Sequence, residues 1–511
     1  MDQSVHRYPS PDGLRVLLAS SEAHPLIKTG GLADVAGSLP LALRELGQDA
    51  RLILPAYPRA ARLLREPRTL CEIKVPGART SVRIMGGSLP DHDLPVYLVD
   101  APEHFCREGN PYTDLSGRDW GDNAERFLLF SRVVAQFAQG LPALGWRPDV
   151  LHTNDWQTGL APALLREVPG RPATIFTIHN LAYQGLFDRA TFDRIGLPSS
   201  LWGMAGLEFH QRMSFIKGGI VFSDRVNTVS PTYAQEVCTP SRGCGLDGLL
   251  RQIGTRFSGI LNGIDYREWD PAVDPLILQP YDQSNFGLKA ENKLDLQREF
   301  GLTRNEGAFL LGYVGRLVEQ KGMDLILGIL PGQLQDPHVQ CVIQASGERP
   351  LELAIQTLAA AHPRQVGVSF GYDETRAHRI EAGCDAFMMP SRFEPCGLNQ
   401  LYSLRYGTPP IVHRTGGLAD TVVHASPAAL ADGQATGFLF DAPTTDSLWQ
   451  GVQQALALSR GNPEGWRRLA VTGMARDFSW EASARSYLQL YADAIAERRL
   501  AGAQSTQPAA A

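Results

Sequence analysis

The sequence predicts an α/β protein with two domains, each built around a parallel sheet. Short apolar runs alternate with longer stretches of helical periodicity along nearly the whole chain, which is typical of βαβ units. The phrase TGGLAD occurs once near each end of the chain, both times after an apolar run. With 511 residues, the chain is long enough for two or more domains with large cores.

The first half of the chain contains six candidate strands. The stretch 123–138, NAERFLLFSRVVAQFA, repeats apolar residues at helical spacing, so we expect a helix between two of these strands. The candidate strands are LRVLLA from residue 14, ARLIL from 50, PVYLV from 95, DVLHT from 149, ATIFTI from 173 and RVNTV from 225.

The second half restarts the same alternation. Between the halves, NGIDYREWDPAVDPL from Asn262 is rich in Asp and Pro and has no periodicity, so we expect the domain boundary there. The predicted domains are 1–262 and 263–475, and 476–511 holds a final amphipathic helix and a small-residue tail that we expect to be disordered. The candidate strands are AFLLGYVG from residue 308, VQCVIQA from 339, VGVSF from 366, DAFMMP from 385 and PPIVH from 409.

The composition argues against several classes of protein. The chain has 48 Lys and Arg against 54 Asp and Glu, with no sustained block of either sign, so a broad surface for nucleic acid or acidic membrane is not expected. No apolar run approaches the ~20 residues that span a bilayer, and the start, MDQSVHRYPSPDG, lacks a signal-peptide pattern, so we expect a cytoplasmic protein. The cysteines form no C-x-x-C pair, which argues against a disulfide framework or a structural zinc site.

The repeated phrase reads KTGGLADV at Lys28–Val35 and RTGGLADT at Arg414–Thr421. The glycine pairs, Gly30–Gly31 and Gly416–Gly417, allow backbone N–H groups to approach an anion, and a helix N-terminus and a preceding cation add favourable electrostatics. The alternative is that two ordinary strand-to-helix turns use glycine for close packing. Six identical residues behind a basic residue in both copies favour two loops that grip one phosphorylated ligand.

Two further motifs follow candidate strands of the second half. GRLVEQKG presents Arg316 and Lys321 in a strand-to-helix loop, which suits a diphosphate, although a solvated surface turn would look the same. SRFEPCGLNQ sets Glu394 after the strand DAFMMP. A carboxylate there could hold sugar hydroxyls or face positive charge at an anomeric carbon, or it could only complement a helix dipole.

In the first half, two neighbouring candidate strands end in polar residues. TIHNLAYQG places His179 and Asn180 after one strand, and HTNDWQTG places Asp155 after the preceding strand. A single histidine is often a hydrogen-bonded core residue, but ligands bind at the carboxyl ends of parallel strands. We therefore expect a floor for a polar substrate here.

Two familiar motifs fail their context, and a third is absent. GCGLDG, residues 243–248, has the letters of a dinucleotide fingerprint but follows CTPSR rather than a strand, so it is interpreted as a loop. Asp91 and Asp93 have the D-x-D spacing of metal-dependent sugar transferases but lie in the turn PDHDLP. The P-loop pattern G-x-x-x-x-G-K-[ST] does not occur, which argues against a P-loop kinase.

Taken in order, KTGGLADV, HTNDWQTGLAP, TIHNLAYQG, LNGID, GRLVEQKG, SRFEPCGLNQLY and RTGGLADT resemble the motifs of bacterial glycogen synthases, relatives of the plant starch synthases. The resemblance implies a glycosyltransferase B-type fold: two Rossmann-like domains facing across a cleft, with the C-terminal helix crossing back to the first domain. It also implies transfer of glucose from ADP-glucose to the non-reducing end of an α-1,4-glucan, with retention of configuration and without a metal.

The resemblance further implies roles for the donor-binding residues. Lys28, with Gly30–Gly31, contacts the donor diphosphate from the first domain. Arg316 and Lys321 neutralise the diphosphate from the second, assisted by backbone amides of Thr415, Gly416 and Gly417. Cations there stabilise the negative charge that develops on the leaving diphosphate.

On the sugar side, the resemblance puts His179 near the primary hydroxyl of the glucosyl group and Glu394 near its ring hydroxyls. Asp155 and Asn262 are further candidates for sugar or acceptor contacts. Because no nucleophile is evident, retention suggests that the departing phosphate accepts the acceptor hydroxyl's proton on the same face.

The chain departs from related patterns at three positions. Many retaining B-type transferases have Glu-x7-Glu, whereas Tyr402 takes the place of the second glutamate. Ala345 and Glu348 stand where relatives have the Gly and Asp of a Gly-rich turn, so the nucleoside side of the site is left open. Two alternatives also remain: a B-type transferase that uses another donor such as UDP-glucose, and a glucan-binding protein that has lost catalysis.

Overall fold

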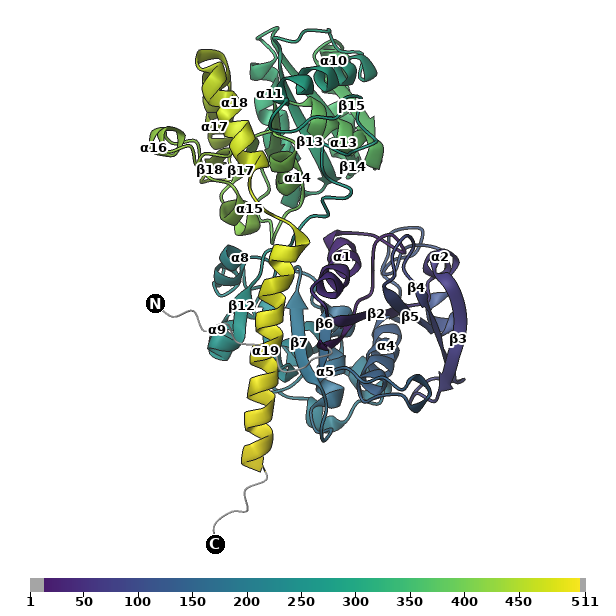
Figure 1. Ribbon diagram of the computed structural model, residues 1–511. Helices are drawn as coiled ribbons and strands as arrows, with labels where there is room; N and C mark the ends of the chain where they lie inside the picture. Colours follow the sequence, from purple (N-terminus) through teal and green to yellow (C-terminus); the bar gives the residue numbers. More distant parts are fainter. Residues whose placement is uncertain (1–12, 506–511) are drawn as a thin grey trace, which may run out of the picture. The chain divides into compact units, whose positions relative to one another are not determined.

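A computed structural model describes residues 13–505 of the chain. These residues form two compact units. Unit 1 contains the residues up to Gly263 together with those from Trp480 onward, and unit 2 contains Ile264–Ser479 (Figure 1). Residues 1–12 and 506–511 lie outside the described residues. The prediction of a disordered tail is wrong for residues 501–505, which belong to the last helix.

Unit 1 is built on a nine-stranded sheet in the order β12-β11-β7-β6-β1-β2-β5-β4-β3. All strand pairs from β12 to β5 are parallel, and β4 and β3 add an antiparallel edge. The six strands predicted in this half are confirmed. The strands are β1 (Arg15–Ala19), β2 (Asp49–Pro55), β3 (Arg65–Ile73), β4 (Val82–Ser88), β5 (Pro95–Asp100), β6 (Val150–Asn154), β7 (Ala173–Ile178), β11 (Arg225–Thr228) and β12 (Phe257–Gly259), and β8 (Leu186–Phe187), β9 (Glu208–Phe209) and β10 (Arg212–Ser214) form a separate small sheet.

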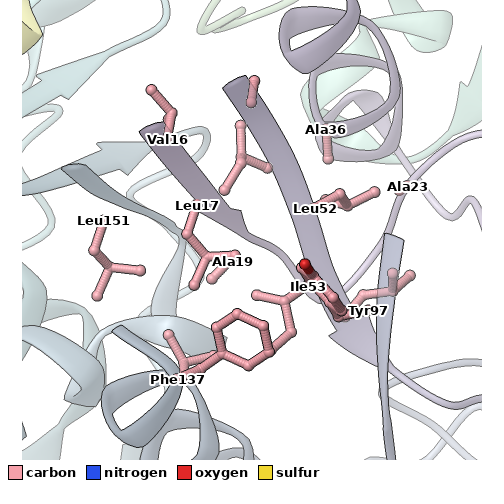
Figure 2. Close-up of a cluster of buried hydrophobic side chains, with 14 of the residues drawn as sticks. Val16, Leu17, Ala19, Ala23, Ala36, Leu52, Ile53, Tyr97, Phe137 and Leu151 are labelled. Atoms are coloured by element: carbon pink, nitrogen blue, oxygen red, sulfur yellow. The ribbon is translucent and has the colours of Figure 1, made fainter. Parts of the chain in front are cut away.

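The sequence did not predict the antiparallel edge because neither of its strands contains a long apolar run. Most residues of β3 are exposed, and β4 carries two consecutive glycines. By contrast, four of the five residues of β1 are fully buried, as expected of a strand covered on both faces. Figure 2 shows this core, in which Phe137 and Ala36 pack against strand side chains such as Ile53 and Leu52.

Helices connect the strands of unit 1. They are α1 (Gly31–Glu45), α2 (Pro58–Leu63), α3 (Pro102–Phe105), α4 (Asn123–Ala138), α5 (Leu160–Leu165), α6 (Arg189–Arg194), α7 (Phe215–Phe222), α8 (Pro231–Glu236), α9 (Asp247–Ile253) and α19 (Trp480–Ser505). The loop reading of GCGLDG holds: residues 243–246 form a turn that leads into α9 and follows no strand.

Helix α19, the long yellow helix of Figure 1, returns the chain to unit 1 and packs against α1 and β7. Buried polar groups fix it there. His152 bonds through Nδ1 to the Tyr491 hydroxyl at 2.8 Å and through Nε2 to the Thr177 hydroxyl at 2.6 Å. Burial lowers the pKa of His152 to about 3, so its ring is neutral at physiological pH.

Unit 2 has a six-stranded, fully parallel sheet in the order β15-β14-β13-β16-β17-β18. Numbered along the unit, this is the order 3-2-1-4-5-6 of Rossmann folds. The five strands predicted in this half are confirmed. The strands are β13 (Phe309–Leu317), β14 (Val339–Gly347), β15 (Val366–Phe370), β16 (Ala386–Met389), β17 (Pro410–His413) and β18 (Phe438–Phe440).

The helices of unit 2 follow the same alternation. They are α10 (Lys289–Glu299), α11 (Met323–Gln333), α12 (Arg349–Ala361), α13 (Glu374–Gly383), α14 (Asn399–Arg405), α15 (Gly416–Thr421), α16 (Pro427–Ala431), α17 (Thr445–Gly461) and α18 (Pro463–Met474). No helix within residues 13–505 is both long and apolar enough to cross a bilayer.

Candidate functional site

In open parallel sheets, ligands bind beyond the carboxyl ends of the strands where the strand order reverses. In unit 2 the order reverses between β13 and β16. The GRLVEQKG segment begins near the end of β13 and continues into the following loop, and the SRFEPCG segment follows β16. Both predicted motifs of the second half therefore lie at the switch point.

A short ion pair joins these two loops. Lys321 Nζ lies 2.6 Å from Glu394 Oε2, and the Ser391 hydroxyl donates to the same oxygen at 2.9 Å. The Glu394 side chain is 8% exposed and that of Lys321 21% exposed. A buried carboxylate needs such partners, because an isolated charge is costly to remove from water.

Backbone contacts hold the two loops together. The Arg392 N–H donates to the Gln320 carbonyl at 2.8 Å, and the Gln320 side-chain amide donates to the Phe393 carbonyl at 3.1 Å. Gly322 has φ +69°, and a Cβ there would lie 2.2 Å from the Pro390 carbonyl oxygen. The final glycine of GRLVEQKG is therefore required by both backbone conformation and close approach.

The second TGGLAD copy packs directly against the Glu394 segment. Gly416 has φ +43°, and a Cβ there would lie 1.9 Å from the Glu394 carbonyl oxygen; a Cβ on Gly417 would lie 2.1 Å from that of Cys396. The Gly417 N–H donates to the carbonyls of Glu394 and Pro395, both at 3.2 Å. The two glycines thus allow the backbone of the second TGGLAD copy to pack closely against the backbone of the Glu394 segment.

The predicted anion cradle of Thr415, Gly416 and Gly417 stays a prediction. The Thr415 N–H donates to the His413 carbonyl at 2.9 Å, and the Gly417 N–H is engaged as described above. The close-packing interpretation of this glycine pair therefore has direct structural support, whereas the amides of Thr415 and Gly417 already have protein partners.

Arg316 lies at the end of β13 with an exposed side chain. Within residues 13–505 it forms no ion pair, so its guanidinium is accessible to an anionic ligand.

The structure also shows how the backbone accommodates the two nearby departures from the related pattern, at residues 345 and 348. Ala345 is a buried residue of β14, and the left-handed conformation that favours glycine falls on Gly347, with φ +153°. The Glu348 N–H donates to the Leu317 carbonyl.

The position of the missing second glutamate is occupied by an aromatic stack. The ring of Tyr402 lies parallel to that of Trp269, with centroids 3.7 Å apart and an angle of 11° between the planes. His378 stacks on Trp269 at the same centroid distance. Tyr402 therefore contributes to the core of unit 2, where a carboxylate would be buried against rings.

In unit 1 the strand order reverses between β1 and β6. The segment after β1 carries the first TGGLAD copy, and Lys28 forms a 2.7 Å ion pair with Asp34, the aspartate of the same phrase. Asp155 directly follows β6, and His179 directly follows β7. The predicted residues of the first half thus belong to the switch-point edge of this sheet.

Asp155 has a strained backbone, with φ 56° and ψ −179°. This conformation is nearly restricted to glycine, and such strain is typical of functional sites. Its carboxylate accepts the His179 backbone N–H at 2.8 Å. Burial raises the pKa of Asp155 to about 7, so this carboxyl group changes charge near neutral pH.

The ring of His179 has a defined tautomer. The Asn154 amide donates through Nδ2 to the Ala19 carbonyl, so its oxygen faces His179 Nε2, 2.9 Å away. Nε2 therefore carries the proton. Burial lowers the pKa of His179 to about 3, which keeps the ring neutral and leaves Nδ1 as an acceptor.

Asn262 is 6% exposed, and its side-chain oxygen lacks a hydrogen-bond partner within the described residues. It lies one residue before the end of the first segment of unit 1. A buried amide oxygen without a partner is costly, and a ligand hydroxyl would satisfy it.

Sequence reasoning missed two residues of the unit 1 site, the buried Glu22 and the partly buried Tyr112. Glu22 is 3% exposed and accepts hydrogen bonds from Thr29 and Tyr112. The available signal was the position of Glu22 in the sequence Ser20–Ser21–Glu22, directly after β1. Polar residues at a switch point are candidates for ligand binding. Tyr112 lies in a long loop before α4 and carries no such signal.

Two Rossmann-like sheets, each with ionisable side chains at its switch point, define a glycosyltransferase of the B-type fold. Comparison with known families agrees. Residues 15–252 match the starch synthase catalytic domain, and residues 297–468 match the glycosyl transferases group 1.

Relatives cover nearly the whole chain. It is 53% identical to glycogen synthase 2 of Nitrosococcus oceani, over 94% of this chain and 98% of that protein. It is 52% identical to glycogen synthase 1 of Methylococcus capsulatus, over 94% and 97%. The chain belongs to the family of glycogen and starch synthases.

Solved structures support the fold. The catalytic domain of starch synthase IV from Arabidopsis thaliana, bound to ADP and acarbose, is 32% identical with a TM-score of 0.86, covering 95% of this chain and 100% of that one. Sucrose-phosphate synthase from Thermosynechococcus elongatus shares the fold at 18% identity and a TM-score of 0.57, with the same coverage. The predicted fold class is therefore confirmed.

The two TGGLAD copies provide a matched test of the packing argument. Gly416→Ala should lower the free energy of unfolding by about 1–3 kcal/mol through backbone strain at this φ, and by more because the Cβ of alanine meets the Glu394 carbonyl. Gly30→Ala, the equivalent change in the first copy, should change it by less than about 0.5 kcal/mol, because Gly30 is extended and a Cβ there meets no described atom within 4 Å. Chemical denaturation measures both; equal effects would contradict the account.

A second test uses the raised pKa of Asp155. Since its folded pKa of about 7 exceeds the ordinary value of 3.8, the neutral carboxyl stabilises the fold at low pH, and this stabilisation is lost as the pH rises to 7. Relative to Asp155→Asn, the wild-type protein should lose up to about 1.4 kcal/mol per pH unit between pH 4 and 7 and little above. Denaturation series at several pH values give this difference. A difference that does not vary with pH would mean that Asp155 has an ordinary pKa.

Proposed function

We propose that this protein transfers glucose from ADP-glucose to the non-reducing end of an α-1,4-glucan such as glycogen, with retention of configuration. The observation that carries the proposal is the Lys321–Glu394 pair at the switch point of unit 2, 2.6 Å apart and largely buried. The structure of a relative, starch synthase IV, contains bound ADP and acarbose, which supports a nucleotide-sugar donor and a glucan acceptor for this chain.

The chemistry follows from where charge develops. Breaking the anomeric C–O bond leaves negative charge on the diphosphate and positive charge on the sugar. In our proposal, Lys321 and Arg316 stabilise the leaving diphosphate, and Lys28 is a further donor-binding residue. Fixed cations lower the barrier because they are in place before the bond breaks.

Glu394 serves the sugar side in this proposal. Its Oε2 already accepts from Lys321 and Ser391, so its other oxygen is the one that would bind a glucosyl hydroxyl. His179, neutral and protonated on Nε2, would accept the primary hydroxyl through Nδ1. Asp155 and Asn262 are proposed as sugar or acceptor contacts.

No residue in this scheme acts as a covalent nucleophile. The departing phosphate oxygen takes the proton of the acceptor hydroxyl as that hydroxyl attacks the same face, which retains configuration. The scheme requires neither a metal nor a cofactor, and a cytoplasmic location fits the use of a nucleotide sugar.

The test compares donors and site variants. With glycogen as acceptor, ADP-glucose should release ADP, and UDP-glucose should be used far more slowly. Glu394→Ala should lower turnover about 100-fold or more. Lys321→Ala should lower turnover and raise the KM for the donor, because Lys321 stabilises the charge that develops on the diphosphate, and Lys28→Ala should chiefly raise that KM. Glu319→Ala is the matched control, because Glu319 is exposed in the same loop as Lys321.

Faster turnover with UDP-glucose would move the protein to another class of B-type transferase. Glycogen binding without ADP release, with Glu394→Ala behaving like the wild type, would make it a glucan-binding protein. Near-normal turnover of Glu394→Ala in an active enzyme would remove this residue from the mechanism.

A further inference from the structure

A buried carboxylate lies beneath the first TGGLAD loop. Glu22 Oε1 accepts the Thr29 hydroxyl at 2.6 Å, and Oε2 accepts the Thr29 backbone N–H. Thr29 immediately follows Lys28, whose own ion pair is with Asp34. The Glu22 carboxylate thus accepts hydrogen bonds from both donors of Thr29, its backbone N–H and its hydroxyl.

The opposite side of Glu22 is held by Tyr112. The Tyr112 hydroxyl donates to Glu22 Oε1 and lies 2.8 Å from the Ser21 hydroxyl. The Asn123 side-chain amide donates to the Tyr112 carbonyl at 3.0 Å. Fully buried Arg126 in turn donates to the Asn123 side chain at 2.7 Å and to the Pro111 carbonyl at 2.9 Å. Two sets of hydrogen bonds, one to the backbone of Tyr112 and one to its hydroxyl, therefore connect helix α4 to the loop.

These hydrogen bonds are unlike ordinary loop packing. Burial opposes the ionisation of Glu22 and raises its pKa. An apolar residue at this position would cost less free energy, which indicates that the carboxylate has a function. The three donors of Thr29 and Tyr112 all point at its oxygens, which leaves the conformation of Thr29 little freedom. Networks of this kind lock the geometry of the segments they connect.

We propose that Glu22 is a positioning residue for the donor: through Thr29 it holds the loop Lys28–Gly31 in the conformation in which Lys28 meets the diphosphate. The inference rests on the proposed function, in which Lys28 binds the donor. Glu22 itself need not touch the donor to have this effect. Helix α4 and Tyr112 provide the fixed support against which the loop is held.

The substitutions separate the contacts. Glu22→Ala removes them all and should raise the KM for ADP-glucose about tenfold, with a smaller change in kcat. Glu22→Gln should be milder, because its oxygen can accept the Thr29 N–H while its amide donates to hydroxyls that can reorient. Thr29→Val, which keeps the backbone bond, should lie between wild type and Glu22→Ala. If Glu22→Ala fails to fold, the other two variants still decide.

The decisive measurement is a cycle with Lys28→Ala in the full-length protein, reading the KM for ADP-glucose at saturating glycogen. If Glu22 acts by positioning Lys28, then Lys28→Ala should cost at least threefold less in the Glu22→Ala background than in the wild type. Effects that multiply would show that Glu22 acts independently of Lys28 and would overturn the inference.

The control is Asp224→Asn, which changes a partly buried carboxylate of unit 1 that is bound by Arg171 and Thr174 just before β11. It should lower the midpoint of unfolding without changing the donor KM. An unchanged KM in Lys28→Ala would refute the role of Lys28 in the proposed function. A changed KM in Lys28→Ala, with an unchanged KM in both Glu22→Gln and Glu22→Ala, would refute the present inference alone.

Discussion

Unit 2 of this protein depends on one constraint, the burial of the Glu394 carboxylate in contact with Lys321. A buried carboxylate is stable only if a cation and hydrogen-bond donors are held in place around it. Ser391 provides a donor, and the glycines at 322 and 416 bring the neighbouring backbones close enough to hold the segment. Bulkier residues at these glycines would displace the backbone that carries the carboxylate.

The same principle organises unit 1 with different residues. Its parallel sheet also reverses strand order, and the polar groups gather at that edge: Asp155 on a strained backbone, His179 in a fixed tautomer and Glu22 under the first TGGLAD loop. The two copies of the phrase differ in their support. The first is held by a buried carboxylate, and the second by backbone packing against the segment it serves.

The sequence predicted most of the parallel strands because they are largely apolar runs, and the site motifs because polar residues follow those runs directly. It did not predict the parallel edge strands β12 and β18, which have three residues each. It missed the antiparallel edge, where β3 is mostly exposed and has no apolar period. It also missed Glu22 and Tyr112, whose pairing joins residues 90 positions apart. Local patterns cannot show such a contact, nor that the Thr415 and Gly417 amides bond within the protein.

The central claim is that Lys321 and Glu394 work as a unit in glucosyl transfer. Its most direct test is kcat with ADP-glucose and glycogen for Lys321→Met, Glu394→Gln and the double variant. If the two residues act as a unit, either substitution alone removes their joint contribution to kcat. The double variant should therefore be no slower than the slower single variant. Two large single effects that multiply in the double variant would contradict the account, as would single variants with wild-type kcat.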